Sequence, residues 1–183
     1  MKKYLIIIFL FIVHTSVSQN IYICKNGEAS FFSKSLIENI DGKSKSMSSI
    51  LNTSTGEIVF VVPMTSFKFK KALMEEHFNE KYVESDKYPY GAYKGMINEK
   101  INYSADGKFS ITSTGILTIH GVKKERTDSG TLVIKDGNIS MQSEFNVALK
   151  DFNIKVPKLL IDNVADSVNV KCNAVFTLYK KDK

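Results

Sequence analysis

The sequence predicts an all-β protein, an antiparallel β-barrel with one internal helix. Two observations predict this fold class. Apolar and polar residues alternate over most of the chain, and a single segment near residues 70–82 shows helical spacing instead. Alternation with a period of two marks strands that have one buried and one solvated face. A closed barrel of about eight strands leaves no open edge. The pattern alone also allows a flat sandwich covered by a helix.

The first residues have the features of an export signal. Lys2 and Lys3 precede an apolar run over residues 4–13, and the small residue Ser18 follows at the spacing that a signal peptidase requires. The apolar run is too short to span a bilayer, which takes about 20 residues. We therefore expect a cleaved signal peptide over residues 1–19 rather than a membrane anchor.

We expect a single exported domain over residues 20–183, located in the periplasm, because no linker, charge block or repeat divides the chain. Removal of the signal takes two lysines from a chain of formal net charge +6, which leaves a mildly basic surface. Without clustered arginines or an RNA-binding aromatic motif, this charge predicts no nucleic-acid partner. It is compatible with transient contact with an anionic membrane surface. The sequence predicts no oligomeric state.

Alternation is clearest in three segments of the second half of the chain. In residues 138–149 and 168–178 most alternate residues are apolar, and residues 109–119 follow the same pattern less regularly. Residue pairs that tolerate positive φ are expected to form turns between the strands. These pairs are Asn26-Gly27, Asp41-Gly42, Asp106-Gly107 and Asp136-Gly137.

One segment departs from the strand pattern and predicts the internal helix. Met74, His77, Phe78 and Tyr82 fall at positions i, i+3, i+4 and i+8, which makes one stripe on a helix. No glycine or proline interrupts this segment. The residue before Pro89 must be extended, so the helix ends ahead of it.

Three motifs resemble those of a known family. Residues 77–89 combine dense polar and aromatic side chains and closely resemble a signature of the YceI-like family, secreted bacterial proteins with a lipocalin-like barrel that bind isoprenoid lipids. Residues 117–124 resemble the family's central strand and turn, and residues 151–157 resemble its late loop. The resemblance covers about residues 24–180. It implies a lipocalin-like barrel, with the helix near one opening and a lipid-sized tunnel inside.

The resemblance and the alternation together indicate which residues contact a ligand. Aromatic and aliphatic side chains on the inner faces suit an apolar chain, because ligand pockets are mostly apolar. The candidate ligand-binding residues are Phe31, Phe60, Val62, Met74, Phe78, Tyr82, Tyr93, Leu117, Ile119, Met141, Phe145, Val147, Phe176 and Leu178. Gly115 and Ala174 share the phase of apolar neighbours and are expected to leave room in the interior. The alternative is a solid core, which would suit a stress-response scaffold.

Two cysteines, Cys24 and Cys172, lie near opposite ends of the expected domain, and an exported protein meets an oxidising compartment. The first and last strands of an up-and-down barrel are neighbours. The two residues are therefore candidates for a disulfide. Two unpaired buried thiols are the alternative, because the sequence does not determine the strand register.

A catalytic role finds less support in the residues. The chain has no Gly-x-Ser-x-Gly motif. His77, Glu80 and Glu84 share a helix face at i, i+3 and i+7, where Asp86 and His120 could join them as ligands for zinc or iron. A metal-dependent enzyme is therefore an alternative function. The same polar residues can instead satisfy backbone groups where the helix meets the next strand. We expect no catalytic residues, no cofactor and no resident metal.

The leading hypothesis is a periplasmic protein that binds an amphiphilic lipid without catalysis. The lipid would be a polyisoprenoid, a quinone or a fatty-acid-like chain. Its apolar tail is expected inside the barrel and its polar head near the rim that carries the helix. Met74, Phe78, Tyr82 and Tyr93 are the candidates for the entrance.

Overall fold

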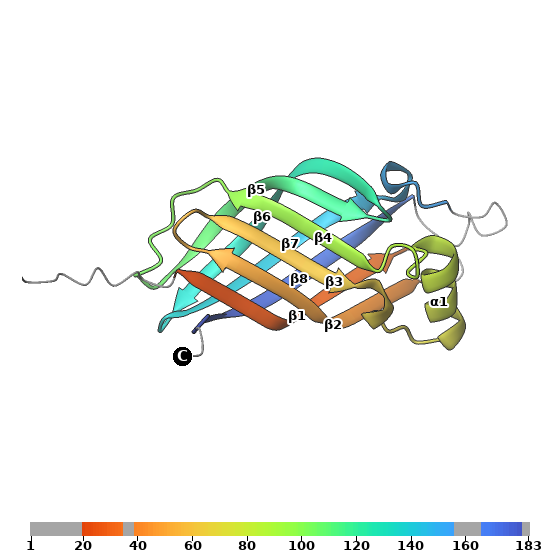
Figure 1. Ribbon diagram of the computed structural model, residues 1–183, viewed down its shortest axis with the longest axis horizontal. Helices are drawn as coiled ribbons and strands as arrows, with labels where there is room; N and C mark the ends of the chain where they lie inside the picture. The colour runs from red at the N-terminus through yellow and green to blue at the C-terminus, as the bar shows by residue number, and fades with distance from the viewer. Residues whose placement is uncertain (1–19, 35–38, 156–165, 181–183) are drawn as a thin grey trace, which may run out of the picture.

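Eight antiparallel strands in the described part of the chain close into a barrel, in which each strand pairs with its neighbours in sequence and the first pairs with the last (Figure 1). The computed structural model describes residues 20–34, 39–155 and 166–180. The strands are β1 (Ile21–Ser33), β2 (Ile40–Asn52), β3 (Glu57–Pro63), β4 (Tyr90–Ile97), β5 (Gly107–Ile119), β6 (Val122–Lys135), β7 (Asn138–Ala148) and β8 (Ser167–Leu178). The predicted all-β barrel is confirmed. The expected signal peptide, residues 1–19, and the last two residues of the third motif, 156–157, lie outside the described residues.

A helical segment between β3 and β4 lies at one end of the barrel (Figure 1). It consists of a 3-10 turn, η1 (Met64–Ser66), the helix α1 (Ala72–His77) and a π-helical turn, η2 (Phe78–Tyr82). Met74, Phe78 and Tyr82 face the barrel interior, whereas Leu73 is 59% exposed. The stripe predicted from helical spacing therefore faces inward. No helix among the described residues is long and apolar enough to cross a membrane.

Only some of the predicted turn pairs form turns. Asp136-Gly137 joins β6 to β7 with φ angles of 50° and 74°, as positive-φ hairpin turns require. Asn26-Gly27 lies inside β1 and Asp41-Gly42 inside β2, so these two predictions were wrong. Glycine is needed at 42 for space rather than for a turn, because a Cβ there would lie 2.5 Å from the Phe31 ring.

The barrel interior is filled at the end opposite the helix. Side chains from β2, β3, β6, β7 and β8 meet there and are excluded from solvent. They include Leu51, Ile58, Leu132, Ile139 and Phe176, each 1% exposed or less, and of these Ile58 also forms part of the cavity wall described below. Burying one such side chain contributes roughly 1.5–3 kcal/mol, so this packed end is the main hydrophobic anchor of the barrel.

The packed end corrects part of the predicted ligand-binding set. Phe176 belongs to this core and does not line the cavity described below. Leu178, two residues further along β8, is 41% exposed. Ala174 is also buried in the core. All three have the inward phase of β8, but alternation predicts the direction of a side chain and not its depth along the barrel.

The predicted role of Gly115 needs a similar correction. It lies opposite Gly95 in the β4–β5 ladder. A Cβ at position 115 would lie 2.4 Å from both the Gly95 Cα and the Lys94 carbonyl oxygen. The residue is small because two backbones approach closely there, so it is not a simple source of free interior space.

The two cysteines are free and far apart. Cys24 lies opposite Ser49 of β2, whereas Cys172 lies opposite Ala29, five residues along β1 from Cys24. At about 3.3 Å per strand residue the separation is roughly 15 Å. A disulfide needs Cα atoms within about 7 Å. The first and last strands do pair as expected, but their register excludes the bridge.

The wall of the barrel has a seam between β6 and β7 at the end that carries the helix. Their ladder runs only from Lys135↔Asn138 to Gly130↔Ser143. The flanking ladders continue much further, to Ile119↔Val122 and to Ala148↔Ser167. In this half of the barrel, side chains rather than backbone hydrogen bonds join β6 to β7.

Candidate functional site

The half of the barrel under the helix encloses a cavity of about 410 Å³. Its wall comes from the inward faces of the strands and from the inward stripe of α1 and η2. Among the predicted ligand-binding residues, those on this wall are Phe31, Phe60, Val62, Met74, Phe78, Tyr82, Tyr93, Leu117, Ile119, Met141, Phe145 and Val147. The interior is therefore hollow on one side of the barrel and solid on the other.

Aromatic side chains hold the helical segment against the barrel. The ring centroid of Phe78 lies 5.3 Å from that of Phe31, 5.5 Å from that of Phe67 and 5.1 Å from that of Phe69. Such aromatic pairs stabilise beyond their buried area, by about 0.5–1.5 kcal/mol each. Phe67 and Phe69 were missed by the sequence prediction, because they lie in an irregular segment that has no periodicity.

A hydrogen-bonded knot at the rim joins the three sequence motifs. The His120 imidazole contacts the Glu84 carboxylate through Nε2 at 2.5 Å and the Phe152 carbonyl oxygen through Nδ1 at 3.0 Å. Glu84 belongs to the first motif, His120 to the second and Phe152 to the third. Both partners accept hydrogen bonds, so the ring donates to both only as an imidazolium. We refer to His120, Glu84 and Phe152 as the rim knot.

Backbone geometry around the rim knot is unusual. Glu84, His120 and Asn153 have positive φ angles of 45°, 51° and 57°. Each costs about 1 kcal/mol or more for a residue other than glycine, and such residues cluster at functional sites. The Tyr88 ring stands edge-on to the His120 ring at 4.6 Å between centroids. A Cβ on Gly121 would lie 2.5 Å from the Tyr88 ring, so the turn after His120 requires glycine.

The candidate metal ligands are not brought together. His77 lines the cavity, Glu80 is exposed and Glu84 is bound to His120. Within the described residues, no three side chains of His, Cys, Asp or Glu are grouped so that they could hold a metal ion. In the first motif, Glu84 instead pairs with His120, and Asn79 Nδ2 donates to the Glu75 carbonyl oxygen at 2.8 Å.

The cavity also contains polar residues that the sequence prediction missed. Asp128 of β6 lines the cavity, and its carboxylate is held by Arg126 through Nε and, at 2.5 Å, through Nη2. The side chains are only 15% and 21% exposed, respectively. Both residues lie in the segment 123–128, where every residue is polar, so no alternation of apolar and polar residues is visible there. Leu132 faces inward, and alternate residues of a strand share a face. Counting back from Leu132 in steps of two would therefore have identified Asp128 and Arg126 as inward-facing.

Burial raises the pKa of three other groups near the cavity. It raises the pKa of Tyr82, and it raises that of Tyr93, whose hydroxyl is hydrogen-bonded to Ser113 Oγ at 2.7 Å. Burial, with a further contribution from the Asp128 charge, raises the pKa of the Cys172 thiol to about 12. The thiol is therefore protonated at neutral pH and is not a nucleophile.

Comparison with known proteins agrees with this description. The YceI-like domain model matches residues 14–176. A polyisoprenoid binding domain from Saccharophagus degradans, implicated in plant cell wall breakdown, superposes with a TM-score of 0.74 at 11% identity, covering 88% of this chain and 99% of that one. Burkholderia cenocepacia BcnA gives 0.70 at 18% identity, covering 82% and 96%. The Campylobacter jejuni YCEI protein gives 0.62 at 19%, covering 99% and 100%. None of the curated protein sequences matches this chain at a significant level.

We expect the His120–Glu84 pair to stabilise the rim in a pH-dependent way. The hydrogen bond from His120, assisted by the Lys87 charge, holds the pKa of Glu84 below its ordinary value of 4.5. The stabilisation is therefore present above that pH and is lost as the pH falls through the lower pKa of the folded protein. Glu84→Gln should melt a few degrees below the wild type at neutral pH. The difference should disappear at about pH 3, as thermal unfolding at a series of pH values would show.

Glu80→Gln is the matched control, because Glu80 is exposed on the same helical segment and the substitution removes the same charge. It should leave the melting midpoint nearly unchanged at every pH. Equal effects of the two variants, or an effect of Glu84→Gln that does not change with pH, would contradict a specific role for the rim knot.

Proposed function

This chain belongs to the YceI-like family, and we propose that it binds one amphiphilic lipid, with the apolar chain of the lipid in the barrel cavity and without catalysis. The ligand classes that we consider are a polyisoprenoid, a quinone and a fatty-acid-like chain. The observation that carries the proposal is the division of the interior into a packed half and a hollow apolar half.

The cavity has the properties that an apolar chain needs. Its volume of about 410 Å³ falls within the range of about 300–1,000 Å³ typical of small-molecule sites. Phe31, Phe60, Phe78 and Phe145 contribute aromatic surface to its wall. Burying apolar ligand surface gains roughly 25 cal/mol per Å², so a chain that fills this space would gain most of its affinity from the hydrophobic effect.

Two further observations bear on the proposal. The thiol on the cavity wall, that of Cys172, is protonated at neutral pH, so it is not activated as a nucleophile. The Saccharophagus degradans domain is described as polyisoprenoid binding. At 11% identity this likeness supports the fold, and it makes a long-chain lipid a reasonable first ligand to test.

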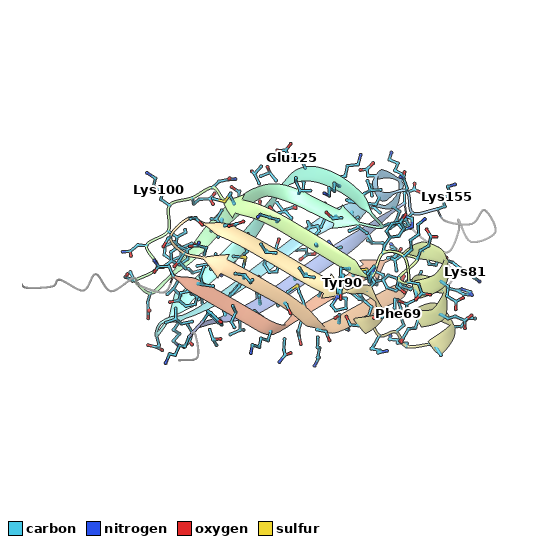
Figure 2. All side chains as sticks on the ribbon, viewed as in Figure 1. Phe69, Lys81, Tyr90, Lys100, Glu125 and Lys155 are labelled. Atoms are coloured by element: carbon cyan, nitrogen blue, oxygen red, sulfur yellow. The ribbon has the colours of Figure 1, made fainter. Side chains whose placement is uncertain are left out.

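Delivery from a membrane is part of the proposal. Figure 2 shows Lys81 and Lys155 at the same end of the molecule as α1. Leu73 of α1 is exposed at this end. An exposed apolar side chain near lysines suits brief contact with an anionic lipid surface, at about 1 kcal/mol per well-placed Lys.

We also propose that the protein acts in the periplasm, on the basis of the export signal. The mature protein should begin at Gln19 or Asn20 and should occur in the soluble periplasmic fraction. N-terminal sequencing of the protein from fractionated cells tests this expectation. Retention of Met1, or recovery only with membranes after a high-salt wash, would contradict it.

Narrowing the cavity should abolish lipid binding without unfolding the protein. Val170 of β8 lines the cavity, opposite Phe31 in one ladder and Phe145 in the other. In Val170→Phe the added ring would occupy the path of the chain. Native mass spectrometry should show that copurified lipid is lost while the melting midpoint stays within a few degrees of the wild type.

Val175→Phe is the matched control, because Val175 is 66% exposed on the outer face of the same strand. It should retain the lipid. If the cavity is filled by side chains in solution, Val170→Phe should instead destabilise the protein by about 1–3 kcal/mol through overpacking, and the wild type should carry no lipid. That result would refute the proposed function.

A further inference from the structure

The inner end of the cavity carries polar groups, although its floor and walls are apolar. Ser113 and Asp128 are partners in the β5–β6 ladder, and Ser143 and Cys172 are partners in the β7–β8 ladder. All four line the cavity, and the Tyr93 hydroxyl joins them through its hydrogen bond to Ser113. We call these five residues the polar belt. They come from five adjacent strands.

The polar belt lies immediately above the floor of the cavity. One inward position further along β5 and β7 lie Ile111 and Met141, which are 4% and 6% exposed and also line the cavity. Asp128 comes from β6, the middle one of the five strands that carry the belt. A ligand end that reaches the floor on this side of the barrel therefore lies next to these groups.

Asp128 of the polar belt forms an ion pair with Arg126, and the pair as a whole carries no net charge. Arg126 takes both oxygens of Asp128, donates from Nη2 to the Asn146 carbonyl oxygen at 3.2 Å, and has its guanidinium 4.5 Å from the centroid of the Phe145 ring. Arg126 therefore lies in the β6–β7 seam, while Asp128 faces the cavity. A desolvated pair of this kind is costly to break, because either charge alone would be left uncompensated.

The hydrogen-bonding capacity of the belt is only partly used. Between Tyr93 and Ser113 one hydroxyl donates to the other, so the hydrogen of the second remains available. Ser143 donates to the Ser129 carbonyl oxygen at 2.8 Å and retains its acceptor sites. The Asp128 oxygens likewise accept more than one hydrogen bond each. The belt can therefore both donate to and accept from a bound group.

These properties determine which chemical group the polar belt favours at the buried end of a ligand. A hydrocarbon end would remove water from the belt and leave its polar groups without partners, which is unfavourable. An anionic carboxylate only accepts hydrogen bonds, so it would gain no donor from the oxygens of Asp128, which also only accept them. A cationic amine would find the charge of Asp128 already neutralised by Arg126. A neutral hydroxyl can donate to Asp128 and accept from the Tyr93–Ser113 pair, so it satisfies both sides.

We infer that the ligand binds with a neutral hydroxyl at the inner end of the cavity, held by Asp128 and the Tyr93–Ser113 pair, so that the preferred class is a long-chain alcohol rather than a fatty acid. This inference rests on the proposed function. It reverses the orientation expected from the sequence, which placed the polar end of the lipid at the rim.

The test compares competitors of one chain length. A neutral fluorescent probe, N-phenyl-1-naphthylamine, is bound to the full domain and displaced by dodecan-1-ol, dodecanoate or dodecane at about pH 8, where the acid is ionised. The alcohol should compete about tenfold better than either of the others, as expected for a satisfied buried hydrogen bond. In Asp128→Asn the Arg126 charge is uncompensated, so the order should reverse and dodecanoate should compete better than the alcohol.

Glu125→Gln is the matched control, because it removes one acidic charge from β6, three positions before Asp128. Glu125 is exposed and points away from the barrel (Figure 2). It should preserve the wild-type order. Ser113→Ala leaves the ion pair intact and guards against misfolding of Asp128→Asn. It should reduce the advantage of the alcohol over dodecane severalfold.

The outcomes separate the two proposals. If the probe binds, and the alcohol and dodecanoate compete equally in the wild type and in Asp128→Asn, the buried-hydroxyl inference is wrong and the proposed function stands. If neither the probe nor any competitor binds the wild type, the proposed function fails and the inference fails with it.

Discussion

The rim knot is the interaction on which the arrangement of the open end depends. Helix α1 has six residues and no side-chain hydrogen bond at its N-cap, and helices shorter than about 12 residues are marginal in water. It therefore needs tertiary support. The knot provides it at the exit from η2, where His120 binds Glu84 and the Phe152 carbonyl, and Phe78 provides it on the inner face by packing on Phe31. Together these contacts hold the helical segment over the barrel end without filling the interior.

The same barrel combines two requirements that conflict in a uniformly packed domain. Stability needs a dry core, and the half built around Leu132, Ile139 and Phe176 supplies it. Binding needs space. The other half provides it, because the helical segment covers the end of the barrel and side chains do not fill the interior beneath it. The β6–β7 ladder ends at Gly130, near the boundary between these halves. Beyond it, Arg126 of β6 pairs with Asp128 of the same strand and donates a hydrogen bond to the Asn146 carbonyl oxygen of β7. The residues that close the wall therefore also bring charge into the cavity.

The sequence predicted the fold well because its main signals are local. Alternation identified the inward faces, and helical spacing identified the stripe of Met74, Phe78 and Tyr82. Depth and register depend on contacts between distant strands, and these were not predictable. Phe176, Leu178 and Cys172 all have the inward phase of β8, yet one lies in the core, one at the exposed end and one on the cavity wall. Arg126 and Asp128 were missed for another reason, since a run of polar residues has no contrast between its two faces.

The hollow half of the barrel is the central claim, and a crystal structure of the protein purified from cells, without added ligand, tests it most directly. We predict elongated, continuous electron density inside the cavity, in contact with Phe31, Phe78 and Met141, with the rim knot intact. A structure in which these side chains move inward and fill the space, leaving no density between them, would contradict the claim and favour a solid barrel.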